Sequence, residues 1–332
     1  MTDYYNRDIK DFQISVVEAR NCLIRSTKMN LITKGNILFY LCLLSFPFYG
    51  CTSSSQPKFD GERAFANLLE QCQFGSRNPG SEGHQRTKKY LLDKLSRYTN
   101  FVKIQDFAYS DQEQKIKLEL TNIIASFYLE KTKRILLCAH WDTRPFADRD
   151  PDTALQTEPI LGANDGASGV AVLLEMARMI SLKEPRWGVD VILFDGEDWG
   201  PEGDLDRFCL GSKYFAENKG DYQPEFGILL DMVGDKDLTI YKEGYSSRYA
   251  KRFVDLVWSR AKSLGLFCFK DSIKYFMYDD HVPLLTAGIP VIDLIDFDYP
   301  YWHTTSDTPD KCSPESLQKV GDLLSGILYY EN

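Results

Sequence analysis

The chain has 332 residues, 43% of them hydrophobic and 13% aromatic, which is enough apolar material for one large α/β domain or two smaller ones. This composition excludes an intrinsically disordered chain. The formal net charge of −9 at pH 7 argues against a protein that binds nucleic acid.

The beginning of the chain has the pattern of an export signal. Residues 36–50 (NILFYLCLLSFPFYG) are apolar and follow Lys34, but the stretch is short and contains a proline, so it is a poor membrane-spanning helix. Gly50 stands before Cys51, and the polar run 52–56 follows. This arrangement resembles the bacterial lipoprotein signal, in which the cysteine carries the lipid.

We therefore expect an exported protein that is lipid-anchored through Cys51 to the bacterial cell envelope. An uncleaved membrane anchor is the alternative. Residues 1–50 would be an N-terminal extension and signal peptide, residues 51–58 a tether, and residues 59–332 the folded domain. Met29 is a second candidate for the start, because a signal peptide that begins there has ordinary length.

The front of the folded domain is predicted to contain two helices and a hairpin. Apolar spacing indicates helices at residues 60–74 and 81–98, with Ser81 as the cap of the second. Residues 101–107 and 117–126 read as strands that pair, because polar turn residues lie between them.

Four later strands each lead toward polar side chains. They cover residues 134–139, 189–194, 226–230 and 290–295. The side chains that follow them are, in order, His140 and Asp142; Asp195, Glu197 and Asp198; Asp231; and Trp302 and His303. Open α/β sheets place their ligand sites at the carboxyl ends of the strands, so we expect these groups to converge.

Asp165 lies where a loop ends and an apolar helix begins, and the helical pattern is clear from Gly169 onward. Its neighbours Asn164 and Ser168 are also residues that start helices, so a solvated N-cap is the simpler interpretation of Asp165 alone. The acids and histidines elsewhere in the chain favour a functional role.

The remaining predicted elements are a strand at 238–241 and helices at 246–264 and 314–330. Short apolar strands that alternate with helices predict a single α/β domain. Its central sheet should be mixed and mostly parallel, flanked by helices, with the antiparallel hairpin at one edge.

Other patterns give no site. The aspartates at alternate positions resemble the start of a calcium loop: Asp148, Asp150 and Asp152. However, Thr153 and Pro159 stand where that loop needs glycine and glutamate.

The cysteines form no Cys-x-x-Cys pair, and the sequence does not fix a disulfide pairing. The glycines near Asp165 match no nucleotide-binding motif, and we expect them to allow close backbone approach: Gly162, Gly166 and Gly169.

Acids and histidines together suggest a metal. The run Asp195, Glu197, Asp198 places three acids within four residues, so they are either solvated or share a metal or a proton. Three of the four histidines follow predicted strands or stand beside paired acids: His140, His281 and His303. Each alone would be read as a structural histidine. With the carboxylates they supply the nitrogen and oxygen donors that zinc prefers.

These residues carry a family resemblance. The ordered series is similar to that of the zinc aminopeptidase superfamily: His140-x-Asp142, Asp165, Glu197-Asp198, Asp231 and His303. Three stretches resemble its glutaminyl cyclase branch in particular: DGEDW at 195–199, YDDHVPL at 278–284 and WHT at 302–304. The similarity extends over roughly residues 60–330.

The resemblance implies roles for individual residues. One Zn²⁺ per chain would be bound by Asp165, Asp198 and His303. Glu197 would be the general acid/base, and Asp231 and Asp279 would share a hydrogen-bond network with it. Trp302 and Trp199 would contact substrate. Many relatives carry Glu-Glu where this chain has Glu197-Asp198, and because aspartate is one methylene shorter the metal would lie closer to the end of that strand.

The implied enzyme is a glutaminyl-peptide cyclotransferase. It would convert the N-terminal glutamine of peptides or proteins to pyroglutamate and release ammonia. Two alternatives stay open: a two-zinc aminopeptidase, in which His140, Asp165 and Asp231 hold a second metal, and a noncatalytic surface lipoprotein that binds peptides. In the cyclase interpretation, His140 is a structural residue beside the site.

Overall fold

The computed structural model describes residues 58–201 and 203–329. The predicted signal peptide and Cys51 lie outside the described residues. Among the helices in the described part of the chain, none combines the length and apolar character needed to cross a membrane.

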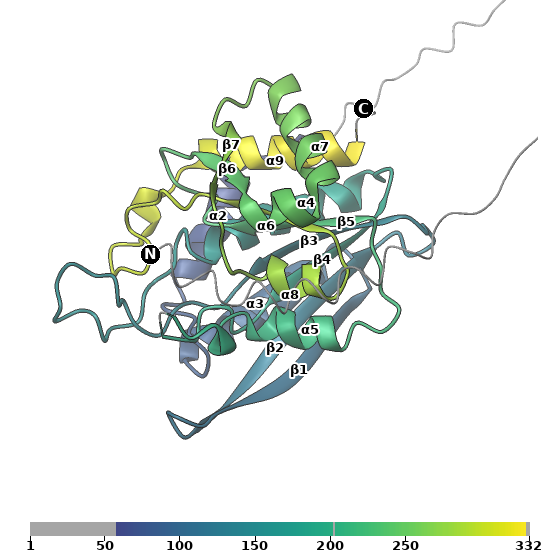
Figure 1. Ribbon diagram of the computed structural model, residues 1–332. Coiled ribbons are helices and arrows are strands. Elements are labelled where there is room, and N and C mark those ends of the chain that lie inside the picture. Colours follow the sequence, from purple (N-terminus) through teal and green to yellow (C-terminus); the bar gives the residue numbers. More distant parts are fainter. Residues whose placement is uncertain (1–57, 202, 330–332) are drawn as a thin grey trace, which may run out of the picture. The chain divides into compact units, whose positions relative to one another are not determined.

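The described residues form a central sheet with helices on both faces (Figure 1). Its strands are β1 (Val102–Asp111), β2 (Ile116–Phe127), β3 (Arg134–His140), β4 (Gly188–Phe194), β5 (Phe226–Asp231) and β8 (Val291–Ile295). Their spatial order is β1-β2-β4-β3-β5-β8. Strands β4, β3, β5 and β8 are parallel to one another, while β1 pairs antiparallel with β2 and β2 with β4. The predicted fold class and edge hairpin are confirmed.

The helices are α2 (Gly61–Cys72), α3 (Glu82–Leu95), α4 (Ala167–Leu182), α5 (Leu210–Glu217), α6 (Gly244–Tyr249), α7 (Lys251–Ser263), α8 (His281–Thr286) and α9 (Pro314–Tyr329). The predicted cap Ser81 is present, because its side chain accepts a hydrogen bond from the backbone N–H of His84, and Asp60 caps α2 in the same way by accepting one from the N–H of Arg63. These local signals placed the first two helices correctly.

The two faces of the sheet bury different sets of side chains, because neighbouring residues of a strand point to opposite faces. Leu137 and Val191 belong to the larger core, which contains residues of α2, α4 and α9. Leu136 and Ile192 belong to a smaller core with residues of α5 and α8. The four parallel strands are buried on both sides, which explains their continuous apolar sequences.

Two predictions for the middle of the chain were wrong in detail. The strand near 238–241 forms as β6 (Ile240–Glu243), but it pairs with β7 (Phe269–Tyr275) in a separate two-stranded parallel sheet. The helix expected at 246–264 is divided into α6 and α7 at Ala250, whose φ of −127° is not helical. Apolar periodicity continues through both helices, so it does not reveal the break.

Candidate metal centre and active site

The parallel strands bring their terminal side chains to one edge of the sheet. His140 is the last residue of β3 and Asp231 the last of β5, and the two strands pair in parallel. Nε2 of His140 lies 3.1 Å from Oδ1 of Asp231. The convergence expected from the strand ends is therefore present.

Asp165 joins this cluster from the loop before α4. Its backbone N–H donates to Oδ2 of Asp307 at 3.1 Å, and the N–H of Asn164 donates to Oδ1 at 2.9 Å. Gly166 follows with a φ of +92°, and a Cβ there would lie 2.6 Å from the carbonyl oxygen of Asp142. The glycine thus permits the close backbone approach that the sequence suggested.

One set of potential metal ligands consists of Asp165, Asp198 and His303, whose donor atoms lie within 4.8 Å of one another. Nε2 of His303 is 3.3 Å from Oδ2 of Asp198 and 3.8 Å from Oδ2 of Asp165. All three residues are buried. Both of these carboxylate oxygens lack a hydrogen-bond partner among the described residues. Two buried, unsatisfied oxygens facing one imidazole nitrogen fit a zinc ion well.

A second set of potential ligands shares one member with the first. It consists of His140, Asp165 and Asp231, again with donor atoms within 4.8 Å. Nε2 of His140 lies 3.2 Å from Oδ1 of Asp165. Because Asp165 belongs to both sets, the arrangement of side chains also resembles what a two-metal site would need.

Glu197 stands next to the ligand set without belonging to it. Its backbone N–H donates to Oδ1 of Asp142 at 3.1 Å, which fixes the turn after β4. Its Oε1 lies 3.6 Å from the Cys209 thiol, and Glu197, Cys209 and Asp279 form a further cluster of facing groups. Burial, followed by the neighbouring carboxylate of Asp198, raises the pKa of Glu197 well above its usual range.

The adjacent acids have opposite electrostatic environments. Burial alone would raise the pKa of Asp198, but His303 and Arg144 outweigh it and lower that pKa. Asp198 is therefore held as an anion, as a metal ligand must be, while Glu197 can retain a proton. This contrast suits different roles for the two residues.

The other two acids assigned to the network lie close by. Asp231 contacts His140, and burial raises its pKa. Burial also raises the pKa of Asp279, whose Oδ2 has no hydrogen-bond partner in the described structure. A shared proton in this region would relieve the repulsion between these carboxylates.

The two tryptophans have different surroundings. Trp302 is partly exposed and stacks on His303 with ring centroids 3.9 Å apart, so it borders the ligand set. Trp199 is 5% exposed, its indole N–H donates to Asp111, and it packs with Leu118 and Leu120. These contacts of Trp199 are structural ones.

Several other predicted polar residues are paired. Asp195 accepts hydrogen bonds from His84 at 2.9 and 3.0 Å, so it stabilises the loop after β4. His281 lies 3.1 Å from Glu243 and belongs to a buried cluster with Asp293 and Asp279. Asp150 accepts hydrogen bonds from the hydroxyl and backbone N–H of Thr305.

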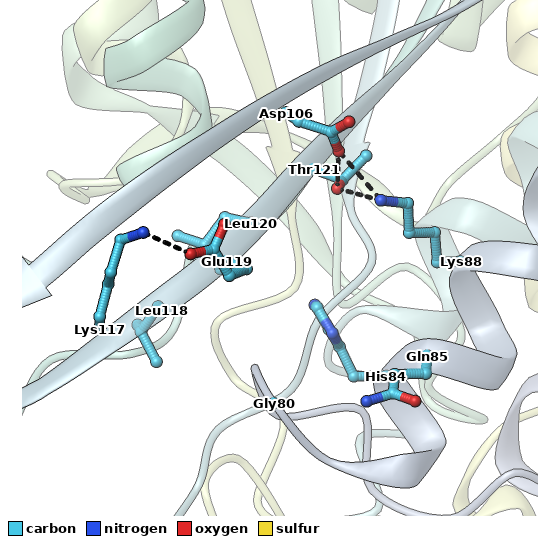
Figure 2. Close-up of a pocket in the computed structure, with 10 residues that line it drawn as sticks. All are labelled: Gly80, His84, Gln85, Lys88, Asp106, Lys117, Leu118, Glu119, Leu120 and Thr121. Carbon is cyan, nitrogen blue, oxygen red and sulfur yellow. Dashed lines mark hydrogen bonds and ion pairs between the residues drawn. The ribbon is translucent and has the colours of Figure 1, made fainter.

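A separate surface cavity of about 550 Å³ lies between α3 and the β1–β2 hairpin (Figure 2). Lys88 reaches across it to Asp106 and Thr121, and Lys117 pairs with Glu119. The residues that line it differ from those of both ligand sets. This cavity is therefore distinct from the candidate metal centre.

Sequence reasoning missed Arg144 and the contribution of Asp148. The guanidinium of Arg144 is 2.6 Å from Asp198 and also binds Asp148. Arg144 and Asp148 are four residues apart, a spacing typical of an ion pair within one helical turn. In a loop, this spacing does not predict an ion pair. The contacts depend on the path of that loop beside the turn after β4.

Comparison with known proteins shows the family to which the chain belongs. Residues 122–328 match Peptidase family M28. The glutaminyl-peptide cyclotransferase-like protein of Bos taurus is 25% identical over 285 residues, which cover 76% of this chain and 71% of that protein. The structure of Tannerella forsythia glutaminyl cyclase is 41% identical with a TM-score of 0.79, covering 83% of this chain and 100% of the other.

A structure described as a Zn-dependent exopeptidase, from Parabacteroides distasonis, is 39% identical with a TM-score of 0.81 and covers 83% of this chain and 100% of the other. The curated relative and the cyclase structure agree with the resemblance to glutaminyl cyclases. The chain belongs to peptidase family M28, in its glutaminyl cyclase branch.

Proposed function

We propose that this protein is a zinc-dependent glutaminyl-peptide cyclotransferase that acts on peptides or proteins with N-terminal glutamine. One observation carries the proposal. A buried set of three zinc-type donors, Asp165, Asp198 and His303, stands directly beside Glu197, a carboxyl group whose pKa is raised well above its usual range. Family membership and the cyclase relatives support the same activity.

Asp165, Asp198 and His303 would hold one zinc ion, which when bound polarises the side-chain carbonyl of the substrate glutamine. The substrate's α-amino nitrogen attacks that carbonyl carbon, a new C–N bond closes the five-membered ring, and the bond to the amide nitrogen breaks. Glu197 accepts a proton at Oε from the attacking amine and returns it to the departing nitrogen, which leaves as ammonia. No water is consumed.

Asp231 and Asp279 would share a bound proton with Glu197. Burial raises the pKa of each of the three carboxyl groups, so this region favours at least one bound proton. Trp302, partly exposed beside His303, would form one wall of the substrate pocket. We assign Trp199 the structural role that its contacts support.

We further propose export and lipid anchoring through Cys51. The apolar stretch 36–50 that ends in Gly50-Cys51 supports this. An enzyme at the cell envelope would meet extracellular or envelope peptides.

A second candidate function is a two-zinc aminopeptidase, because the set His140, Asp165 and Asp231 has donor atoms within 4.8 Å. The two functions release different products from one substrate. Incubation of the purified protein with a Gln-initiated peptide should give ammonia and a peptide lighter by one ammonia. Release of free glutamine with a shortened peptide would instead identify the aminopeptidase.

A further inference from the structure

A buried arginine connects two of the proposed zinc ligands. Arg144 is 0% exposed. Its Nη1 donates to Oδ1 of Asp198 at 2.6 Å, and its Nε and Nη2 donate to the two oxygens of Asp148 at 2.9 and 2.5 Å. The guanidinium is planar and rigid, so a side chain that binds two carboxylates at once fixes their relative positions.

Asp148 extends the connection to His303. Its Oδ1 lies 3.5 Å from Nδ1 of His303, on the side of the ring away from the metal ligands. Nε2 of the same ring lies 3.3 Å from Oδ2 of Asp198. A carboxylate beside Nδ1 favours the tautomer in which that nitrogen carries the proton and Nε2 is free to bind a metal.

The contact with Arg144 also distinguishes the two oxygens of Asp198. Oδ1 accepts the arginine hydrogen bond, whereas Oδ2 has no hydrogen-bond partner among the described residues. Oδ2 is therefore the oxygen that can approach a metal. The aromatic rings of Phe146 and Phe208, with centroids 4.8 and 5.4 Å from Cζ of Arg144, restrict the movement of the guanidinium.

We infer that Arg144 and Asp148 form a positioning pair for zinc: Arg144 orients Asp198 so that it binds through Oδ2, and Asp148 orients His303 so that it binds through Nε2. The negative charge of Asp148 also offsets the arginine charge, which alone would oppose a cation at this site. This inference rests on the zinc site of the proposed function, but it does not depend on which reaction the enzyme catalyses.

The first test is the zinc affinity of Asp148→Asn. This variant keeps the shape of the side chain but removes its charge, so Asp198 alone offsets the arginine charge and Nδ1 of His303 loses its carboxylate partner. Zinc affinity, measured by competition with a chelator on zinc-free protein, should fall about 10- to 100-fold. The absorption spectrum of the Co²⁺-loaded variant should also change, because it reports the geometry of the ligands.

The matched control is Asp190→Asn. Asp190 binds Arg134 through two hydrogen bonds of 2.7 Å, but Arg134 begins β3, whereas His140 ends it at the metal-site edge. Asp190→Asn therefore breaks a similar partly buried pair away from the site. It should lower the melting temperature of the zinc-free protein and leave zinc affinity and the Co²⁺ spectrum unchanged.

Arg144→Lys is the second variant, in case Asp148→Asn does not fold. Lysine keeps the positive charge but lacks the planar group whose three nitrogens hold the two carboxylates, so zinc affinity should again fall and the Co²⁺ spectrum change. Wild-type zinc affinity in a folded Asp148→Asn or Arg144→Lys protein would overturn the inference. Since zinc binding is measured without substrate, a protein that shows the zinc effect but no cyclisation would refute the proposed function alone.

Discussion

His140 contacts two carboxylates through the same nitrogen: its Nε2 lies 3.1 Å from Asp231 and 3.2 Å from Asp165. Burial alone would lower the pKa of His140, but the neighbouring carboxylates of Asp142, Asp165 and Asp231 outweigh it and raise that pKa well above its usual range. A protonated imidazole here would supply the positive charge that a second metal would otherwise supply.

We therefore predict one zinc per chain. Elemental analysis after dialysis against excess zinc and then against buffer should give about one tightly held ion, the stoichiometry of a single three-residue site. Two tightly held zinc ions would show that His140 loses its proton and binds a metal. That outcome would favour the aminopeptidase.

Glu197 and Asp198 should respond differently to substitution. Glu197→Gln preserves shape and leaves Asp198 free, so the protein should retain zinc while cyclisation falls by about 10²-fold or more through loss of proton transfer. Asp198→Ala should lose zinc together with activity, because two ligands hold the ion poorly. Ammonia release and zinc content are measured for each variant. Near-normal turnover in Glu197→Gln, or loss of zinc from it alone, would contradict these roles.

Zinc binding should depend on pH through His303. Burial alone would lower the pKa of His303 in the zinc-free protein, but the carboxylates of Asp198 and Asp148 outweigh it and raise that pKa to about 9. Zinc must displace this proton, so its affinity should rise with pH up to about 9 and then level off. Chelator competition across this range, with proton release measured in weak buffer, checks the prediction. A flat profile would contradict it.

The proton on His303 should also make the stability of the zinc-free protein depend on pH. Zinc affinity should rise with pH, whereas this stability should fall. An unfolded histidine has a pKa of about 6.5, so the raised folded value contributes stability that is fully present below that pH. In the zinc-free protein this contribution should be lost as the pH rises through about 9. Denaturant unfolding of zinc-free protein at several pH values should show the loss, and protein saturated with zinc should not show it.

Gly166→Ala should destabilise the protein more than Gly80→Ala. Both glycines have positive φ, +92° and +86°, so both substitutions introduce backbone strain of about 1–3 kcal/mol. Only at Gly166 would the new Cβ also meet backbone, 2.6 Å from the carbonyl oxygen of Asp142, whereas nothing lies within 4 Å at Gly80. Urea unfolding of the two variants measures the difference. Equal losses of stability would show that the loop before α4 can shift.

Cys51 should determine where the protein resides. If the cysteine is lipidated, Cys51→Ala should release the protein from the membrane fraction or leave its precursor unprocessed. Membrane fractionation and intact mass are the measurements, and Cys72→Ala, a change within α2, is the control. Unchanged fractionation and mass in Cys51→Ala would exclude the anchor.

The sequence by itself determined where the main strands lie along the chain and the edge of the sheet at which the site lies. Apolar strands that end in His140, Asp231 and the acids after β4 are local patterns, and parallel pairing brings such ends together. The caps Asp60 and Ser81 are likewise local, which is why the early helices agreed with prediction.

Only the tertiary structure decided which acid pairs with which base. Asp195 and Asp198 are three residues apart in one loop, yet the first binds His84 and the second faces His303 and Arg144. These partners come from distant parts of the chain, and their distances depend on how whole elements pack. A pKa follows from those distances and from burial, so acids close together in the sequence acquire pKa shifts of opposite direction only in the folded protein.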